Sequence, residues 1–212
     1  MDDFFARMRH ALEPSYLASD EPWKQSGFSG PEARWVALRR PVADCIDRDG
    51  SFLDVGCANG YLVECVLRWT AKRGLAVDPW GLDLSPPLVA LAQRRLPHLA
   101  DRFHVANAAT WQPPRRFDFV RTELCYVPAD DERAYLQHLL ARYVGPGGAL
   151  LVCNYAEDQP DVAARILPGA HPTTKIIDRL VALGFAVERY RDGADVDRHK
   201  ARKMRVAVIR AA

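Results

Sequence analysis

The stretch Ser51–Leu62, with the sequence SFLDVGCANGYL, carries the clearest structural signal in this chain. An apolar run ends in Asp54, a tight turn with Gly56 and Gly60 follows, and the chain then enters a segment with apolar residues at helical spacing. A strand, a glycine turn and a helix N-terminus in this order bring backbone N–H groups close to a ligand with negative or polar groups. The stretch therefore predicts a ligand-binding turn at the end of a buried strand.

The spacing of the glycines distinguishes this turn from two common nucleotide-binding loops. A dinucleotide-binding fold requires the pattern GxGxxG, whereas here Ala58 lies between the two glycines and Tyr61 occupies the place of the third glycine. A P-loop requires a Lys-Ser or Lys-Thr pair after the glycines, and none follows here. The turn therefore disfavours NAD as the ligand, and it disfavours a P-loop more strongly.

From Ser51 onward, strand and helix patterns alternate along the chain. They predict strands at 51–55, 80–84, 102–106, 117–122, 149–154, 185–190 and 204–209, and helices at 61–69, 86–95, 131–143 and 173–183. Ser85 is expected to cap the second helix, Gly184 to end the last one, and Gly145–Gly148 to form a turn. We therefore expect an α/β fold with a doubly wound, mostly parallel seven-stranded sheet, helices on both faces and a C-terminal antiparallel hairpin.

The N-terminal region has a different character. The segment FFARMRHAL, residues 4–12, has the pattern of an amphipathic helix, and residues 14–31 are rich in Pro, Ser and Gly, with Trp23 and Phe28 among them. We expect residues 1–50 to form a helical cap or lid over the site, with a simple packed N-terminal arm as the alternative. Residues 51–212 would then form the ligand-binding part of a single domain.

Composition limits the classes of function. With 212 residues, 49% of them hydrophobic, the chain can bury the core of one globular domain. No window approaches the ~18 consecutive apolar residues of a membrane helix, and the start carries two acids where a secretory signal would be positive, so we expect a soluble, cytoplasmic protein. A net charge of +2 argues against nucleic acid as a partner, and the basic cluster Arg198–Arg205 is interpreted as a solvated loop. The five cysteines form no CxxC pair, so we expect no metal site.

The motifs, taken together, resemble those of class I S-adenosylmethionine-dependent methyltransferases. Asp54–Gly60 is similar to the first motif of that family, an acid followed by GxGxG, with Ala58 in place of the middle glycine. Further similar segments follow in the family's order: Gly81–Ser85, Ala106–Ala108, Phe117–Val120 and Gly145–Gly148. The resemblance covers 51–209 and implies S-adenosylmethionine as the cofactor, bound by Asp54, Gly56, Cys57, Ala58, Asn59, Gly60, Asp83, Leu84, Asn107, Ala108 and Thr122.

Three polar residues at strand ends receive specific roles from this resemblance. Asp83 would bind the ribose hydroxyls; the competing acid, Asp78, precedes a proline and lies before the strand. Asn107 would accept from the adenine amino group, with an Asx-turn as the alternative. Asp54 would meet the ammonium end of the methionine moiety through water, and is otherwise a turn residue.

The acceptor side is expected where the fourth strand ends beside the first. Glu123 and Tyr126 are the candidate catalytic residues, with Glu123 as a base or as an anchor for an acceptor amine; its alternative is a local cap or ion pair. The candidate acceptor-binding residues are Trp23, Phe28, Asn154 and Tyr155. Core packing is an equal alternative for Tyr155, and the two cap aromatics could simply close the cavity.

Three functions remain open from the sequence. The favoured one is methyl transfer to oxygen or nitrogen of a small molecule, with no nucleic acid or membrane as partner. The absence of an Asn-Pro-Pro-Tyr stretch after the fourth strand counts against the adenine or glutamine amino-methylating branch of the family. The alternatives are an RNA or protein methyltransferase that uses the basic cluster, and a nucleotide-binding module without catalysis.

Overall fold

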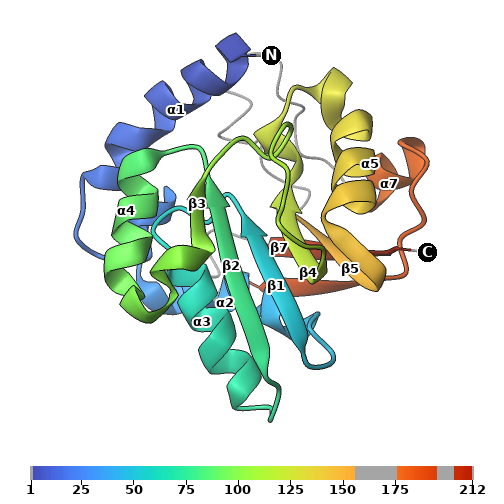
Figure 1. Ribbon diagram of the computed structural model, residues 1–212, viewed down its shortest axis with the longest axis horizontal. Coiled ribbons are helices and arrows are strands. Elements are labelled where there is room, and N and C mark those ends of the chain that lie inside the picture. The colour runs from blue at the N-terminus through green and yellow to red at the C-terminus, as the bar shows by residue number, and fades with distance from the viewer. Residues whose placement is uncertain (1, 156–175, 195–202, 212) are drawn as a thin grey trace.

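A computed structural model describes residues 2–155, 176–194 and 203–211 of the protein (Figure 1). These residues form one sheet with the strand order β3-β2-β1-β4-β5-β7-β6. Strands β1 to β5 run parallel, β7 is antiparallel to β5, and β6 is antiparallel to β7. The bounds are β1 Gly50–Val55, β2 Val77–Asp83, β3 Phe103–Val105, β4 Phe117–Glu123, β5 Val144–Tyr155, β6 Arg189–Ala194 and β7 Lys203–Arg210. The predicted fold class is confirmed.

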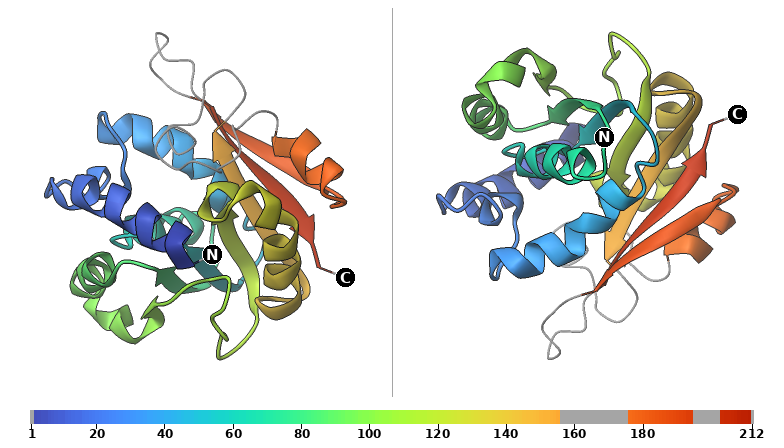
Figure 2. Two further views of the ribbon diagram at one scale, coloured as in Figure 1. Left: turned by 90° about the horizontal axis from the view of Figure 1, so that it is seen from above. Right: turned by 90° about the horizontal axis from the view of Figure 1, so that it is seen from below.

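Helices cover both faces of the sheet (Figure 2). Strand alternation sends neighbouring side chains to opposite faces: Leu53 of β1 packs with α5 and α7, whereas Phe52 packs with α2 and α3. None of the described helices has both the length and the apolar character of a membrane span. The helices are α1 Asp2–Leu17, α2 Glu32–Asp44, α3 Tyr61–Ala71, α4 Pro86–Arg95, α5 Glu132–Arg142 and α7 Ile176–Ala182, with 3-10 turns η1 Lys24–Ser26, η2 Pro97–Arg102, η3 Leu124–Tyr126 and η4 Ala129–Asp131.

Two helix ends follow from local chemistry that the sequence shows. The Ser85 hydroxyl accepts a hydrogen bond from the N–H of Leu88 at 3.4 Å and caps α4, which begins at Pro86. Gly184 follows α7 with φ +88°, and its N–H donates to the carbonyl of Val181 at 2.9 Å. The N–H of Phe185 reaches back to Leu180 at 3.0 Å, which completes a Schellman motif.

The strand predicted at 185–190 is displaced along the chain. Residues 185–188 form the link from α7, and β6 begins only at Arg189, paired with Val208. Phe185 and Val187 are apolar because they pack against the main core from this link. Their partial burial resembles the pattern of a strand, so the prediction of a strand here was wrong for residues 185–188 and right for 189–190.

The cap region contains more helix than its sequence pattern indicated. The predicted amphipathic helix is present as α1, which continues past Pro14 to Leu17. A second helix, α2, was not predicted, although Trp35, Leu38 and Val42 are fully buried at helical spacing along it. Arginines at other positions of α2, two of them buried, obscured the stripe.

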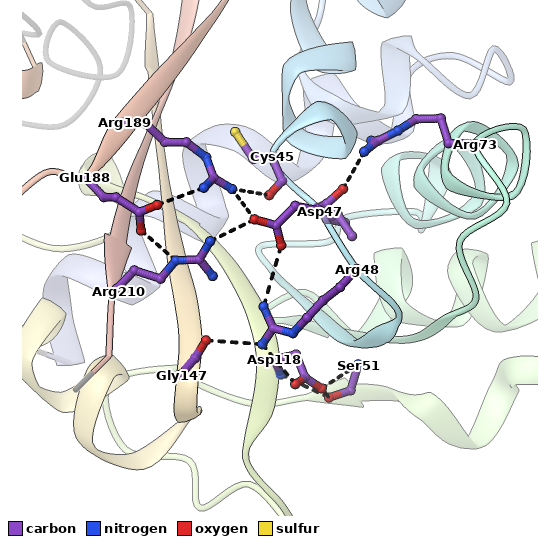
Figure 3. A network of polar contacts seen from close by, with 11 residues as sticks. Cys45, Asp47, Arg48, Ser51, Arg73, Asp118, Gly147, Glu188, Arg189 and Arg210 are labelled. Carbon is purple, nitrogen blue, oxygen red and sulfur yellow. Dashed lines mark hydrogen bonds and ion pairs between the residues drawn. The ribbon is translucent and has the colours of Figure 1, made fainter.

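A network of charged side chains joins the C-terminal hairpin to the start of β1 at the edge of the sheet away from the site (Figure 3). Asp47, just before β1, accepts from Arg189 at 2.6 Å and from Arg210 at 2.8 Å. Glu188 accepts from the same two arginines, at 2.8 and 2.6 Å. Because each arginine is shared by two carboxylates, the network fixes β6 and β7 against the connection between α2 and β1.

The glycines of 145–148 lie inside β5 rather than in a turn before it. Phe117 pairs with Val144 and Phe119 pairs with Ala149. Between these two pairs β5 advances by five residues and β4 by only two, so β5 forms a bulge. Gly147 has φ +67° in this bulge. A Cβ atom on Gly148 would lie 2.8 Å from the carbonyl oxygen of Gly145 and 2.9 Å from that of Asp118.

Gly148→Ala should therefore destabilise the protein, whereas Gly145→Ala should not. The added methyl group at position 148 meets backbone atoms that cannot move aside, which we expect to cost about 1–3 kcal/mol of unfolding free energy. At Gly145 the nearest backbone atom lies 3.6 Å from an added Cβ, an ordinary contact. Urea denaturation of both variants measures the difference, and equal stabilities would contradict the bulge geometry.

Candidate active site

Two adjoining cavities lie at the carboxyl ends of the strands, and side chains of α1 line both of them. The first cavity is formed by the ends of β1 and β2, the turn after β3 and one side of α1. The second cavity is formed by the glycine turn, α1, α2 and the ends of β4 and β5. Both share Met8, Leu12, Tyr16, Gly56 and Tyr126. The pair of cavities can therefore hold one elongated ligand that passes Gly56 beneath α1.

The glycine turn adopts backbone conformations that explain its composition. Gly56 and Gly60 both have φ +75°, and a Cβ atom on Gly56 would collide with the Tyr126 ring. Ala58, which replaces the family's middle glycine, has φ +46°, the left-handed region that a side chain rarely adopts. Gly60 lines neither cavity; it packs behind the turn, where an added Cβ would lie 3.0 Å from Ala92.

Asp83 ends β2 in the first cavity and is held by the backbone. Its two carboxylate oxygens accept the N–H groups of Ala58 at 2.8 Å and of Ser85 at 2.9 Å. Burial raises the pKa of this carboxyl, and the backbone hydrogen bonds oppose that rise. Asp78, the competing acid, pairs instead with Arg102 at 2.6 Å and is not part of either cavity wall.

The turn after β3 also lines the first cavity. Asn107 and Ala108 of this turn lie in the cavity wall, together with Leu84, which follows β2. The side-chain oxygen of Asn107 accepts the N–H of Ala109 at 2.9 Å, which is the Asx-turn anticipated as the alternative for this residue. Asn107 therefore combines the turn geometry with a place in the cavity, and its contact with an adenine remains a prediction.

Asp54 brings a buried carboxylate to the second cavity. Its side chain is 1% exposed, and one oxygen accepts from Arg121 Nη1 at 3.3 Å. Among the described residues the other oxygen, Oδ2, has no hydrogen-bond partner. Burial raises the pKa of this carboxyl to about 6, although the charge of Arg121 opposes the rise. A buried acceptor without a partner suits a cationic ligand group.

At the end of β4, the Glu123 side chain lies in the wall of the second cavity and the Thr122 side chain is buried. Arg121 and Glu123 share one face of the strand and form an ion pair in the wall of the second cavity. Thr122 points to the opposite face, where it is fully buried and lies 2.7 Å from the Tyr135 hydroxyl. The predicted cofactor contact of Thr122 is therefore replaced by a core hydrogen bond, because strand alternation turns this side chain away from the cavities.

Tyr126 separates the two cavities. Its ring lies against Gly56, and its hydroxyl accepts a hydrogen bond from Arg121 Nη1 at 2.9 Å. Burial raises the pKa of this hydroxyl, so it remains protonated at neutral pH. The predicted pair Glu123 and Tyr126 is thus brought together at one cavity wall by an arginine that the sequence interpretation did not use.

Cap residues contribute to the site in a different way from the prediction. Asn154, near the end of β5, lies in the wall of the second cavity, and its contact with an acceptor remains a prediction. Trp23 donates its indole N–H to Gly30 at 3.0 Å, and Phe28 is buried in the packing of α2. Neither belongs to a cavity wall, because the α1 side chains, Tyr16 among them, take that place. The side chain of Tyr155 lies outside the described part of the structure.

The glycine turn is tied to the cap by a side chain. Asn59 donates to the side-chain oxygen of Gln25 at 2.7 Å and to the carbonyl of Pro22 at 3.1 Å. Its own side-chain oxygen accepts the N–H of Tyr61 at 3.2 Å. The amide of Asn59 therefore orders the turn and the cap together. Cys57 is buried beside it and lines the second cavity.

Two buried arginines were missed by the sequence interpretation. Arg39 of α2 and Arg121 of β4 both line the second cavity. Arg39 is close enough to lower the pKa of Asp54 by its charge. A signal for Arg121 was available: it interrupts the apolar strand FDFVRT, and a charge within a buried strand requires a partner.

The chain is similar to known proteins in sequence and in fold. The profile of a family described as "Methyltransferase domain" matches residues 32–200. A curated trans-aconitate 2-methyltransferase from Methylobacterium nodulans is 30% identical over 157 residues, and the match covers 65% of this chain and 57% of the relative. The chain thus spans a little over half the length of that relative.

Solved structures share the fold. The N-methyltransferase NodS from Bradyrhizobium japonicum WM9, solved with S-adenosyl-L-homocysteine, has a TM-score of 0.69 at 16% identity, over 95% of this chain and 97% of that one. The 1,6-didemethyltoxoflavin-N1-methyltransferase of Burkholderia thailandensis has a TM-score of 0.70 at 19% identity, over 100% and 90%.

The family profile covers most of the chain, and the fold and the order of the motifs agree with it. The chain belongs to the class I S-adenosylmethionine-dependent methyltransferase family.

Proposed function

We propose that this chain transfers a methyl group from S-adenosylmethionine to an oxygen or nitrogen atom of a small-molecule acceptor. The observation that carries the proposal is the pair of joined cavities beneath α1, with Asp83 in one and Asp54 with Glu123 in the other. A site covered by a helix of its own chain suits a small acceptor better than an RNA or protein surface. Methyl transfer to RNA or protein, and binding without catalysis, stay as alternatives.

The residues present fit the cofactor in both halves. Asp83 accepts one backbone N–H at each oxygen, which orients the carboxylate and leaves lone pairs for two ribose hydroxyls. The unpartnered Asp54 Oδ2 suits the ammonium group of the methionine half. Arg39 in the same cavity supplies a cation for the carboxylate of that half. The other predicted cofactor residues of the turn and of the first cavity would supply backbone and apolar contacts.

Methyl transfer requires the protein mainly to position the acceptor. The bound cofactor would supply a methyl group on sulfonium, which is already an activated leaving group, so alignment of the acceptor is the main requirement. Glu123, held in its ion pair at the cavity wall, can accept a hydrogen bond or a proton from an acceptor O–H or N–H. Tyr126 and Asn154 would orient the acceptor from either side.

The curated relative suggests a second, specific acceptor chemistry. Its name states trans-aconitate, a carboxylic acid, as its acceptor. Carboxylates are ionised at neutral pH and can be methylated on oxygen without a general base. Glu123 therefore distinguishes the two acceptor classes: an amine or hydroxyl acceptor would need it, whereas a carboxylate acceptor would not.

Incubation with methyl-labelled S-adenosylmethionine tests the function directly. We expect label to pass to a small molecule when acceptors are offered as separate pools of carboxylates, including trans-aconitate, and of amines and hydroxyl compounds. The assay should give no label in RNA or protein, and binding to RNA should show no steep salt dependence. A protein that binds the cofactor but labels none of the pools would support the binding-module alternative.

Gly56→Ala should abolish stabilisation by S-adenosylhomocysteine, because the added methyl group pushes Tyr126 out of the wall between the cavities. Wild-type protein at a ligand concentration a hundredfold above Kd should gain about 2.7 kcal/mol, seen as a higher Tm. NAD should give no shift. The matched control is Gly74→Ala, since Gly74 has φ +74° but no atom within 4 Å of an added Cβ.

The control bears the same backbone strain without the collision, so it should lose stability but keep the ligand-induced shift. Ala58→Gly should also keep it, because glycine adopts φ +46° more easily than alanine. Equal loss of the shift in the Gly56 and Gly74 variants would mean that strain alone, and not the cavity wall, is responsible.

Glu123→Gln and Asp83→Asn should affect different steps. With an amine or hydroxyl acceptor, Glu123→Gln should lower kcat and leave cofactor affinity nearly unchanged, because the side chain faces the acceptor cavity. Asp83→Asn should weaken cofactor binding by the loss of charge-assisted hydrogen bonds worth about 1.5–3 kcal/mol. Calorimetry and initial rates measure both effects; a large change of cofactor affinity in Glu123→Gln would contradict its acceptor role.

A further inference from the structure

Arg121 contacts four different groups around the second cavity. It is 3% exposed, and Nη1 donates to Asp54 Oδ1 at 3.3 Å, to the carbonyl of Val55 at 3.3 Å and to the Tyr126 hydroxyl at 2.9 Å. Nη2 donates to Glu123 Oε1. One guanidinium therefore contacts the end of β1, the end of β4 and η3.

The position of Arg121 follows from sheet register. Asp54 of β1 and Arg121 of β4 are direct partners in the parallel ladder, so their side chains leave the sheet on the same face. Glu123, two residues further along β4, leaves on that face as well. Burying an arginine is costly unless its charge is paired. Here the two carboxylates of the cavity pair the charge, while Nε has no hydrogen-bond partner among the described residues.

We propose that Arg121 is a positioning residue for the methyl-transfer site: it keeps the Asp54 carboxylate ionised and turned toward the cofactor, and it holds Glu123 and Tyr126 at the acceptor wall. This inference rests on the cofactor placement proposed above. A lysine could not replace it fully, because only the planar fork of a guanidinium donates to Asp54, Tyr126 and Glu123 together.

The electrostatics of Asp54 make Arg121 necessary. Asp54 interacts electrostatically with the acid Asp83 on β2, the cation Arg39 on α2, and Cys57, Tyr126 and Cys153 on the adjoining segments. Glu123 shares the Arg121 guanidinium with it. Burial raises the pKa of Asp54 to about 6, and Arg121 is the strongest opposing influence. Removal of the guanidinium charge would raise this pKa further, and a protonated Asp54 cannot pair with the ammonium group of the cofactor.

The same guanidinium prepares the acceptor side. The Tyr126 hydroxyl accepts from Nη1, so its own hydrogen points away from Arg121 and can be donated to another group. The ion pair with Glu123 fixes that carboxylate at the cavity wall and balances its charge. Arg121 therefore orients side chains on both the cofactor side and the acceptor side of the site.

The test is the pH dependence of S-adenosylhomocysteine affinity, measured by calorimetry between pH 5 and 7.5, where the α-amino group of the ligand stays protonated. In the wild type, affinity should fall as the pH drops through about 6, the pKa of Asp54, and approach tenfold per pH unit below it. In Arg121→Gln, which removes the charge, the midpoint should move up by about one pH unit or more. In Arg121→Lys, which keeps the charge, it should stay near that of the wild type.

Asp54→Asn in either background assigns the pH dependence, because it should weaken binding and flatten the profile. A midpoint that is the same in Arg121→Gln and the wild type would overturn the inference. If Arg121→Gln does not fold, the wild type and Asp54→Asn still decide: equal affinities and parallel profiles would overturn it. If the wild type binds no S-adenosylhomocysteine at any pH, the proposed function fails. If the wild type binds it and the two Arg121 variants have the same midpoint, only the inference about Arg121 fails.

Discussion

Strand β1 lies between β2 and β4, and the whole site depends on this position. Because both neighbours run parallel to β1, the three carboxyl ends meet at one edge of the sheet, and the connections leave toward opposite faces. Asp54 at the end of β1 thereby comes close to Asp83 from β2 and to Arg121 from β4. The glycine turn follows immediately, and the backbone N–H groups of Gly56 and Cys57 donate to the carbonyl of Leu82 at 2.7 and 3.0 Å. The turn is thus held against β2, and its remaining groups face the cavities.

The site concentrates charge where little water reaches it. Asp54, Arg121 and Arg39 are each less than 10% exposed, and Glu123 is paired at the cavity wall. In such surroundings a single unpaired charge is costly, so the positions of the charged side chains depend on one another. The arrangement also explains why the glycine turn, the cap and the end of β4 form one unit: Asn59 links the first two, and Arg121 links the turn region to the last.

The fold and the walls of the second cavity come from different parts of this molecule. The fold is shared with methyltransferases at 16% and 19% identity, and such similarity establishes architecture alone. The walls that would select an acceptor are supplied by α1, by α2 and by the ends of β4 and β5.

Most of the alternation of strands and helices, the glycine turn, the caps at Ser85 and Gly184, and the acids at the strand ends could be predicted from the sequence. These features depend on side-chain period and on local backbone chemistry, which neighbouring residues record. Only the tertiary structure decided that Thr122 turns into the core, that Trp23 and Phe28 pack away from the cavities, and that α1 covers the site. It also decided that Arg121 pairs with Asp54, 67 positions away along the chain. Such contacts follow from strand register and from the packing of distant segments, which no local pattern encodes.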